Sequence, residues 1–330
     1  MLSNLLFGYK ATQCLYVAAK LNIADHLAAG RKSISELSAL TNTHPDGLYR
    51  IMRCLAGLHV FFESSNKEFS LTEEAYDLRS DSENTIKDFI ILCGEELYQA
   101  TGDLLYSAYT GKPAFENLYG MSHWQYLEEN PEKANIFHTA MERGTIPMLK
   151  KIIELYDFSS SKTIVDVGGG KGHLLCEILS QHKDTTGIVL DLQNAEVCAN
   201  EYIQSKCLSD RAKFISGDFF ESIPDADLYI LKVVIHDWDD EHAIKILKNC
   251  RKSISKSGKL VIIDKMIGEY HFRHLSASLN DINMLVTTGG KERSEEEFSN
   301  LLELSGFKLT RVIHNSFVFA IIEAEPVNTI

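Results

Sequence analysis

The sequence predicts an α/β protein with a mostly helical N-terminal domain and a C-terminal doubly wound sheet that ends in an antiparallel hairpin. Its 330 residues are more than one core ordinarily holds, so we expect two domains. Helical periodicity dominates the first half of the chain. From residue 163 onward, short β-branched runs alternate with helical segments, which is typical of a parallel sheet covered by helices.

Three helices are predicted at the start of the chain. Residues 9–29 carry apolar side chains at helical spacing, and Gly30 follows as a C-cap. Ser33 with Glu36 three residues later has the spacing of a capping box, so a second helix begins there. Pro45 suits the first turn of a third helix, because that turn leaves its N–H groups unpaired anyway.

A polar turn at residues 64–67 separates two short apolar runs, 60–63 and 68–71, and predicts a hairpin. Helix, short helix, helix and hairpin form a winged helix-turn-helix pattern, which fits either DNA binding or packing and dimerisation. Residues 1–95 contain nine Lys or Arg and twelve Asp or Glu, an acidic balance that repels phosphate backbones. The charge therefore favours a dimerisation domain over a DNA-binding one.

Composition points to a cytoplasmic protein without nucleic-acid or membrane partners. The formal net charge is −13, and no run of 18 apolar residues exists. Residues 1–10 lack the features of a signal peptide. The seven cysteines are scattered without a CxxC pair, so neither a zinc site nor a disulfide framework is expected, and a reducing compartment fits.

The second domain is predicted over residues 96–330, after a first domain over 1–95. Its first part, 96–155, reads as mostly helical, and its core, 156–330, contains the strands. Strands of the parallel sheet are expected at Thr163–Val167, Gly187–Leu190, Lys213–Ser216, Asp227–Val234 and Lys259–Ile263. The tail holds two more, Lys308–Ile313 and Ser316–Glu323, joined by His314 and Asn315 as an antiparallel hairpin.

A glycine-rich turn follows the first of these strands. Asp166, Gly168 and Gly170 form a D-x-G-x-G pattern, and glycines at such a turn let the backbone approach a ligand closely. A dinucleotide fingerprint fails, because His173 occupies its third glycine position, and no phosphate loop is present. The pattern favours S-adenosylmethionine, although a purely structural turn would also use glycines.

Acidic residues at the next two strand ends complete a nucleoside pocket. Asp191, followed by Leu192, lies about 20 residues after the glycines, where a carboxylate accepts ribose hydroxyls. Asp218 with Phe219 follows the third strand and suits an adenine amino group and ring. Ligands of such sheets bind at the carboxyl ends of the strands, so the three sites belong together.

A histidine and two acids form the candidate catalytic group. His236 is expected at the end of the fourth strand, Asp264 at the end of the fifth, and Glu292 in a later Gly-Gly-Lys-Glu-Arg segment. A phenol has a pKa near 10 and histidine one near 6.5, so a carboxylate-supported histidine is a reasonable base for phenolic or enolic hydroxyls. The alternative is a histidine that only caps a helix.

Five motifs carry a resemblance to a known family. They are Asp166-Val-Gly-Gly-Gly-Lys-Gly, Gly217-Asp-Phe-Phe, Ala226-Asp-Leu-Tyr-Ile-Leu, Ile235-His-Asp-Trp-x-Asp-Glu and Gly289-Gly-Lys-Glu-Arg. Together they resemble the small-molecule O-methyltransferases of plants and animals, such as the caffeate, flavonoid and acetylserotonin enzymes, and their bacterial secondary-metabolite relatives. The similarity runs nearly end to end and includes the N-terminal winged-helix dimerisation domain.

The resemblance implies a Rossmann-like methyltransferase domain, a homodimer, and S-adenosylmethionine as cofactor, with S-adenosylhomocysteine as product and no metal. Lys232 matches a position that touches the cofactor. His236 matches the general base, flanked by Glu292 and by Asp264, which is often a longer Glu in plant members. The resemblance also implies four acceptor-lining residues, for which core packing is the alternative: Phe137, Met141, Asn283 and Met284.

Two functions remain open at this stage. The first is methyl transfer to a phenolic or enolic hydroxyl of a small hydroxylated metabolite. The second is a non-methylating reaction, such as hydroxylation, decarboxylation or a pericyclic step, because some relatives keep the cofactor site for these. The sequence retains His236 and both acids, which favours methylation, and it does not name the acceptor.

Overall fold

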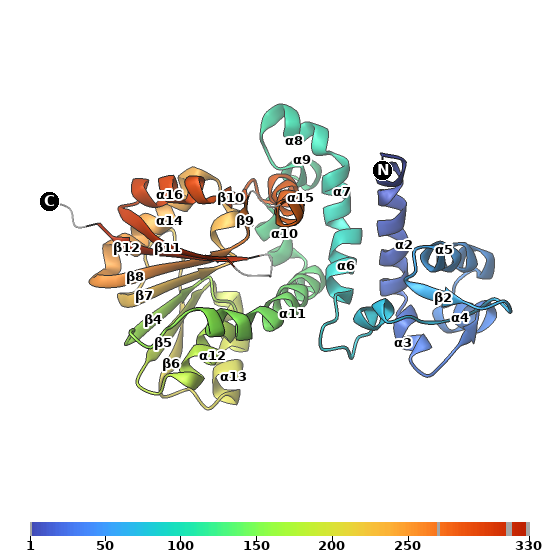
Figure 1. Cartoon of the computed structure of the whole chain (residues 1–330), viewed down its shortest axis with the longest axis horizontal. Coiled ribbons are helices and arrows are strands. Elements are labelled where there is room, and N and C mark those ends of the chain that lie inside the picture. The colour runs from blue at the N-terminus through green and yellow to red at the C-terminus, as the bar shows by residue number, and fades with distance from the viewer. Residues whose placement is uncertain (1, 269–270, 315–318, 328–330) are drawn as a thin grey trace. The chain divides into compact units, whose positions relative to one another are not determined.

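The computed structural model describes residues 2–268, 271–314 and 319–327, and it divides into two compact units (Figure 1). Unit 1 comprises Met1–Asp103 and Phe115–Pro147, and unit 2 comprises Leu104–Ala114 and Met148–Ile330. Over the described ranges, no helix is long and apolar enough to cross a membrane. The domain boundary at residue 95 stays a prediction.

Unit 1 begins with the winged-helix elements. These are α1 (Leu2–Leu6), α2 (Gly8–Lys20), α3 (Ile23–Leu27), β1 (Lys32–Ser33), α4 (Ile34–Thr41), α5 (Pro45–Gly57), β2 (Phe61–Glu63) and β3 (Glu68–Leu71). The capping box of Ser33 and Glu36 and the Pro45 helix start are confirmed. The predicted hairpin is also confirmed, and β1 adds a third strand in the order β1-β3-β2.

The single helix predicted over residues 9–29 is wrong. The chain breaks at Asn22, whose φ of 55° is left-handed and separates α2 from α3. Asparagine tolerates this conformation better than most residues. Lys87 Nζ donates a hydrogen bond to the Asn22 side chain, so a residue distant in sequence holds the break in place.

Helices occupy most of residues 85–155, as predicted, and a short 3₁₀ helix, η1, precedes them. They are η1 (Glu74–Leu78), α6 (Lys87–Gly94), α7 (Glu96–Gly102), α8 (Leu104–Thr110), α9 (Ala114–Tyr119), α10 (His123–Glu129) and α11 (Pro131–Leu155). Within this region, Leu104–Ala114, which contains α8, and the residues after Pro147 belong to unit 2.

Unit 2 is built on a seven-stranded sheet in the order β11-β12-β8-β7-β4-β5-β6. Its strands are β4 (Thr163–Val167), β5 (Thr186–Asp191), β6 (Ala212–Ser216), β7 (Ala226–Lys232), β8 (Ile254–Asp264), β11 (Phe307–His314) and β12 (Ala320–Pro326). The first five are parallel, and β12 pairs antiparallel with both β8 and β11. The predicted fold class is therefore confirmed. The strand order reverses between β4 and β7, where ligands of such sheets bind.

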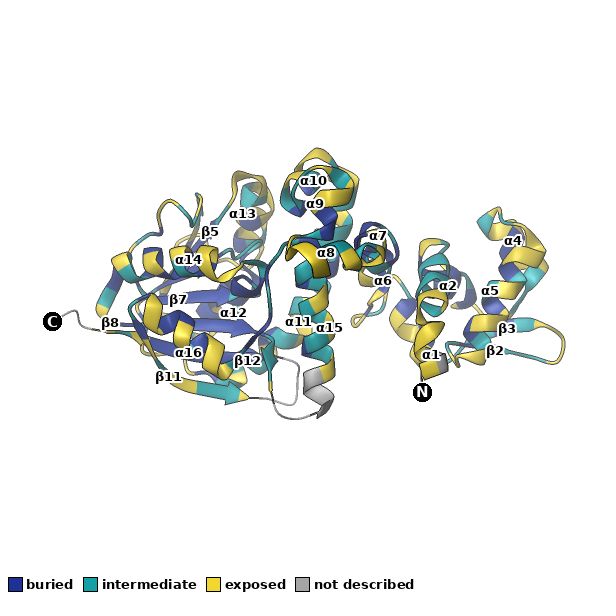
Figure 2. Cartoon of the chain, turned by 90° about the horizontal axis from the view of Figure 1, so that it is seen from above, coloured by how far each residue is buried: buried dark blue, intermediate teal, exposed yellow. Residues whose placement is uncertain are grey.

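Helices cover both faces of this sheet, and two buried clusters result. One face packs against α14 (Asp240–Ser253) and α16 (Glu295–Leu304). The other packs against α12 (His173–Gln181), α13 (Glu196–Ser205) and the end of α11. In Figure 2 the central strands are buried, whereas the covering helices carry exposed residues on their outer sides.

Two strand ends differ from the prediction. β7 was expected to reach residue 234 but ends at Lys232, because Val233 has a left-handed φ of 57° and a 3₁₀ turn, η3 (Ile235–Asp237), follows. β8 begins at Ile254, earlier than expected. The tail forms the expected antiparallel pair, while the junction at Asn315 and the first residues of the Ser316–Glu323 prediction lie outside the described residues.

Two further features were not predicted in unit 2. Strands β9 (Met266–Ile267) and β10 (Arg293–Ser294) form a short parallel pair, and helix α15 (His271–Thr287) lies between them in sequence. The pair connects the segment after Asp264 with the segment after Glu292. This connection shapes the site described below.

Gly94 provides a test of the packing in unit 1. A Cβ at this last residue of α6 would lie 2.4 Å from Tyr16 Cβ on α2, so we expect Gly94→Ala to lower the free energy of unfolding by about 1–3 kcal/mol. Gly102 ends α7 with nothing within 4 Å of its added Cβ, and Gly102→Ala is the matched control. Urea unfolding of both variants measures the difference. Equal stabilities would contradict the close approach of α2 and α6.

Candidate active site

The glycine turn after β4 is held close to neighbouring strands. Gly168 has a φ of 68°, and its N–H donates to the Leu190 carbonyl at 2.8 Å. A Cβ at Gly168 would come within 2.9 Å of Val234 Cγ2, so a larger residue would disturb the segment that leads to His236. Gly170 also has a left-handed φ, of 57°, yet no atom lies within 4 Å of where its Cβ would be. The turn is thus tight on one side and open at Gly170.

Asp191, the last residue of β5, ties this turn to the next strand. Its Oδ2 accepts the Gly170 N–H at 2.7 Å, and its Oδ1 accepts the Leu192 N–H at 2.7 Å. Each carboxylate oxygen has a second lone pair, so it can accept a further hydrogen bond. Leu192 itself is exposed.

A buried acid and a partly buried lysine lie on the strands beside the turn. Burial raises the pKa of Asp166 to about 6, and the positive charge of Lys232 opposes the shift. Burial lowers the pKa of Lys232, which interacts with both Asp166 and Asp264. Lys232 therefore links the glycine turn electrostatically to the acid beside His236.

The loop after β6 is fixed by a buried amide. Asn249 on α14 donates from Nδ2 to the carbonyls of Phe219 and Phe220, both at 2.9 Å. Asp218 Oδ1 accepts the Phe220 N–H at 2.8 Å, and the Phe219 ring meets Trp238 edge-on at 6.0 Å. Sequence reasoning missed Asn249, whose one signal is a polar residue within the apolar stripe of its helix.

His236 lies on the 3₁₀ turn just beyond β7 and is held by Glu292. The distance from His236 Nδ1 to Glu292 Oε1 is 2.9 Å, and Asn280 Nδ2 on α15 donates to the same oxygen at 2.5 Å. Because an ionised carboxylate can only accept, the ring proton belongs on Nδ1. His236 Nε2 is then directed elsewhere, 3.7 Å from Asp237 Oδ1.

The acids around His236 control its charge. Burial lowers the pKa of His236, but the negative charges of Asp237, Asp264 and Glu292 outweigh that effect and raise it to about 9. Burial raises the pKa of Asp237 to about 6 and that of Asp264 to about 7. The acids thus favour a charged His236 ring, while burial disfavours the ionised forms of Asp237 and Asp264.

Asp264 acts at a distance rather than by direct contact. Both of its carboxyl oxygens are buried without a hydrogen-bond partner among the described residues. It ends β8 next to β7, and it interacts with His236 through charge. The direct partners of His236 are instead Glu292 and, at a longer distance, Asp237. Neither Asp237 nor Asn280 was predicted from the sequence to be a site residue. Asp237 adjoins His236 in its motif, whereas nothing in the sequence marks Asn280.

Unit 2 brings most of the predicted residues to one edge of the sheet. Glu292 lies there together with residues from the ends of β4 to β8. The latter are Asp166, Gly168, Gly170, Asp191, Leu192, Asp218, Phe219, Lys232, His236 and Asp264. Of the expected acceptor-lining residues, Asn283 and Met284 lie on α15 in the same unit. Phe137 and Met141 lie in unit 1, where they pack against Leu92, Leu97 and Ala140.

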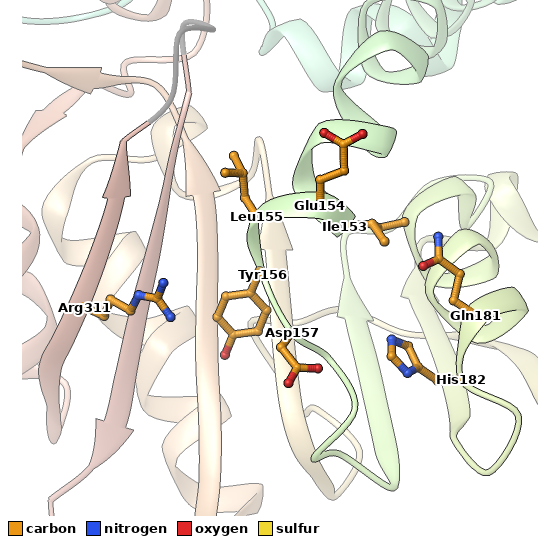
Figure 3. Close-up of a pocket in the computed structure, with 8 residues that line it drawn as sticks. All are labelled: Ile153, Glu154, Leu155, Tyr156, Asp157, Gln181, His182 and Arg311. Atoms are coloured by element: carbon orange, nitrogen blue, oxygen red, sulfur yellow. The ribbon is translucent and has the colours of Figure 1, made fainter.

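Two further observations concern metal ligands and a surface pocket. Among the residues that the structure describes, no group of three or more His, Cys, Asp or Glu is placed to hold a metal ion. A surface pocket of about 360 Å³ in unit 2 shares no residue with the predicted site (Figure 3). It is lined by Ile153, Glu154, Leu155, Tyr156, Asp157, Gln181, His182 and Arg311.

Known proteins resemble both parts of the chain. An O-methyltransferase domain family matches residues 102–308, and an O-methyltransferase dimerisation domain family matches residues 3–81. Phenazine O-methyltransferase PhzM from Lysobacter antibioticus is 38% identical over 328 residues, which are 99% of this chain and 96% of that protein.

Two further relatives differ in what their names describe. The crystal structure of NcsB1, an O-methyltransferase from neocarzinostatin biosynthesis in complex with S-adenosylmethionine and 2-hydroxy-5-methyl naphthoic acid, has a TM-score of 0.86 at 31% identity and covers 96% of each chain. Phenazine-1-carboxylate N-methyltransferase from Pseudomonas aeruginosa is 28% identical over 94% of this chain and 92% of its own length. Most such relatives are thus named for O-methylation and some for N-methylation. The chain therefore belongs to the S-adenosylmethionine-dependent O-methyltransferase family whose members join a dimerisation domain to a methyltransferase domain.

Proposed function

We propose that this enzyme transfers the methyl group of S-adenosylmethionine to a phenolic or enolic hydroxyl of a small secondary metabolite, with His236 as general base. The observation that carries the proposal is the buried hydrogen bond from His236 Nδ1 to Glu292. It leaves Nε2 as the ring nitrogen able to take a proton from an acceptor. PhzM and NcsB1 are both named as O-methyltransferases, which supports this acceptor chemistry.

The residues around the glycine turn suit this cofactor. Asp191 and Asp218 offer carboxylate acceptors, which match the hydroxyl and amino donors of a nucleoside and would repel a pyrophosphate. Gly170 leaves open space beside the turn, where a Cβ would otherwise stand. We assign the ribose to Asp191 and Leu192, the adenine to Asp218 and Phe219, and the remaining contacts to Gly168, Gly170, Asp166 and Lys232. When bound, the cofactor supplies a sulfonium methyl group.

Proton removal is the task of the His236 group. His236 accepts the hydroxyl proton at Nε2, and Glu292 and Asp237 then stabilise the imidazolium by charge and hydrogen bonding. Asp264 adds to the same field from its buried position. As proposed, this step requires no metal ion.

An amine acceptor is the second candidate, because one relative is named as an N-methyltransferase. A neutral amine already presents a lone pair and has no need of a base to expose it. The retained His236 and Glu292 pair therefore favours a hydroxyl acceptor. A non-methylating reaction has no methyl acceptor, so His236 and Glu292 would then have no acceptor proton to remove.

The acidic surroundings of His236 give a prediction that needs no acceptor. In histidine-labelled NMR, His236 should remain protonated at pH 7 and titrate near 9, because its neighbouring carboxylates favour the charged ring. Only the neutral ring can accept a proton at Nε2, so methyl transfer should increase as the pH rises toward this pKa. Glu292→Gln removes one negative charge and should lower this pKa. The control is Asp239→Asn, an exposed acid that pairs with His242 instead. Titration of wild-type His236 at or below its ordinary value of 6.5 would show that burial dominates.

The two halves of the proposed site should separate by mutation. With a labelled-methyl screen over phenolic metabolites, His236→Ala should lower turnover by about 10²–10⁴-fold and leave cofactor affinity intact. Asp191→Ala should weaken calorimetric binding of S-adenosylmethionine by about 10–100-fold, since a charged hydrogen-bond acceptor is lost. Unimpaired turnover by His236→Ala would remove it as the base, and unchanged binding by Asp191→Ala would remove the ribose contact.

We also propose that the N-terminal domain forms a homodimer. Apolar side chains on α1 and at the start of α2 are exposed in the single chain: Leu2, Leu5, Leu6, Phe7 and Tyr9. Light scattering should give about 74 kDa, twice the 37.1 kDa of one chain. Leu6→Glu should shift the mass toward one chain, because a buried unpaired charge opposes association. Leu304→Glu on α16, an equally exposed leucine, is the control that should stay dimeric. A monomeric wild type would refute the dimer.

A further inference from the structure

Arg293 is a fully buried charged residue next to Glu292. Its guanidinium donates from Nε and Nη2 to Asp240 Oδ1, at 3.0 and 2.8 Å. Nη2 also donates to the Trp238 carbonyl at 2.9 Å, and Nη1 donates to the Ile235 carbonyl at 3.1 Å and the Lys291 carbonyl at 3.3 Å. Every nitrogen of the group is therefore used, as a buried guanidinium requires.

The carbonyls of Ile235 and Trp238 bracket the turn that carries His236. This turn starts after Val233, whose left-handed φ of 57° is unfavourable for a β-branched residue. Backbone in such a conformation persists only where the surroundings hold it. Arg293 supplies two of the holding contacts, one on each side of His236.

The same segment closes on the turn at a second point. A Cβ at Gly290 would lie 2.1 Å from the His236 carbonyl oxygen, so the two backbones are in direct contact there. Two residues later, Glu292 binds the His236 ring. Residues 290–293 thus fix both the backbone of the His236 turn and the orientation of its imidazole.

We propose that Arg293 is a positioning residue for the general base, with Asp240 as its counter-ion. Arg293 does not meet the acceptor; it aligns the His236 turn with Glu292 so that the Nδ1 hydrogen bond forms and Nε2 keeps one direction. Asp240 orients the guanidinium from its solvent side. The inference rests on the proposed role of His236 as base.

Lysine cannot reproduce this arrangement. The planar guanidinium reaches two carbonyls and a carboxylate at fixed angles, whereas an ammonium is a single point with rotatable donors. Arg293→Lys keeps the charge and loses the simultaneous contacts. It therefore tests geometry rather than electrostatics.

The experiment compares three variants of the full chain. Arg293→Lys should lower kcat by about 10²-fold with little change in the acceptor KM or in cofactor affinity, because small misplacements of a catalytic group have effects of that size. The His236 Nδ1 proton, observed by NMR, should exchange with solvent faster than in the wild type, because its hydrogen bond to Glu292 is less well aligned. Asp240→Asn, at a residue whose side chain is 54% exposed, should give a smaller loss in the same two readouts. Asp239→Asn, the same change at the neighbouring exposed acid that pairs with His242 instead, should change neither.

Two outcomes would overturn the inference. The first is an unchanged His236 proton signal and kcat in Arg293→Lys. The second is a loss of cofactor affinity and of thermal stability that accompanies the loss of kcat in both Arg293→Lys and Asp240→Asn. That result would indicate a general structural role for Arg293. The NMR readout needs no acceptor, so a failure of the proposed methyl transfer would leave the positioning role separately measurable.

Discussion

The hydrogen bond between His236 and Glu292 is the contact around which the segments of the candidate site in unit 2 are arranged. Both groups are buried, and leaving either one without the other would strand a charge in a region that excludes water. Separate parts of the chain converge to prevent this. β7 delivers the histidine, β10 fixes the segment of the glutamate, and α15 contributes Asn280 to the shared oxygen.

Electrostatics connects this pair to the glycine turn. Lys232 at the end of β7 interacts with Asp166 beside the turn and with Asp264 at the end of β8. A series of alternating charges therefore runs across three adjacent strands. The arrangement explains why the sheet tolerates polar residues at the very ends of strands that are otherwise apolar. It also gives the residues around His236 a charge balance that any bound cation would alter.

Structural features that depend on neighbouring residues could be predicted from the sequence, whereas features that depend on contacts between distant residues could not. The β4 strand, the glycine turn, the Ser33 capping box and the tail hairpin all follow from neighbouring residues. The helix break at Asn22 depends on Lys87, and the early end of β7 depends on the turn that Arg293 supports. Asn249 and Asn280 act through partners about 30 and 12 residues away, which no local pattern reveals. The roles of the site residues stay predictions, although the strands of unit 2 bring most of them to one end of the sheet.

The contact between Gly290 and the His236 carbonyl limits which residues can replace Gly290 during evolution. At Gly170 the backbone angle alone disfavours other residues, and the surrounding space would accept a side chain. At Gly290 the space itself is absent, so any side chain would push the turn that holds the histidine. Mutations that reshape the acceptor specificity of a descendant enzyme must therefore accumulate elsewhere. Gly290, at the point of closest approach to the His236 turn, therefore admits no other residue without a shift of that turn.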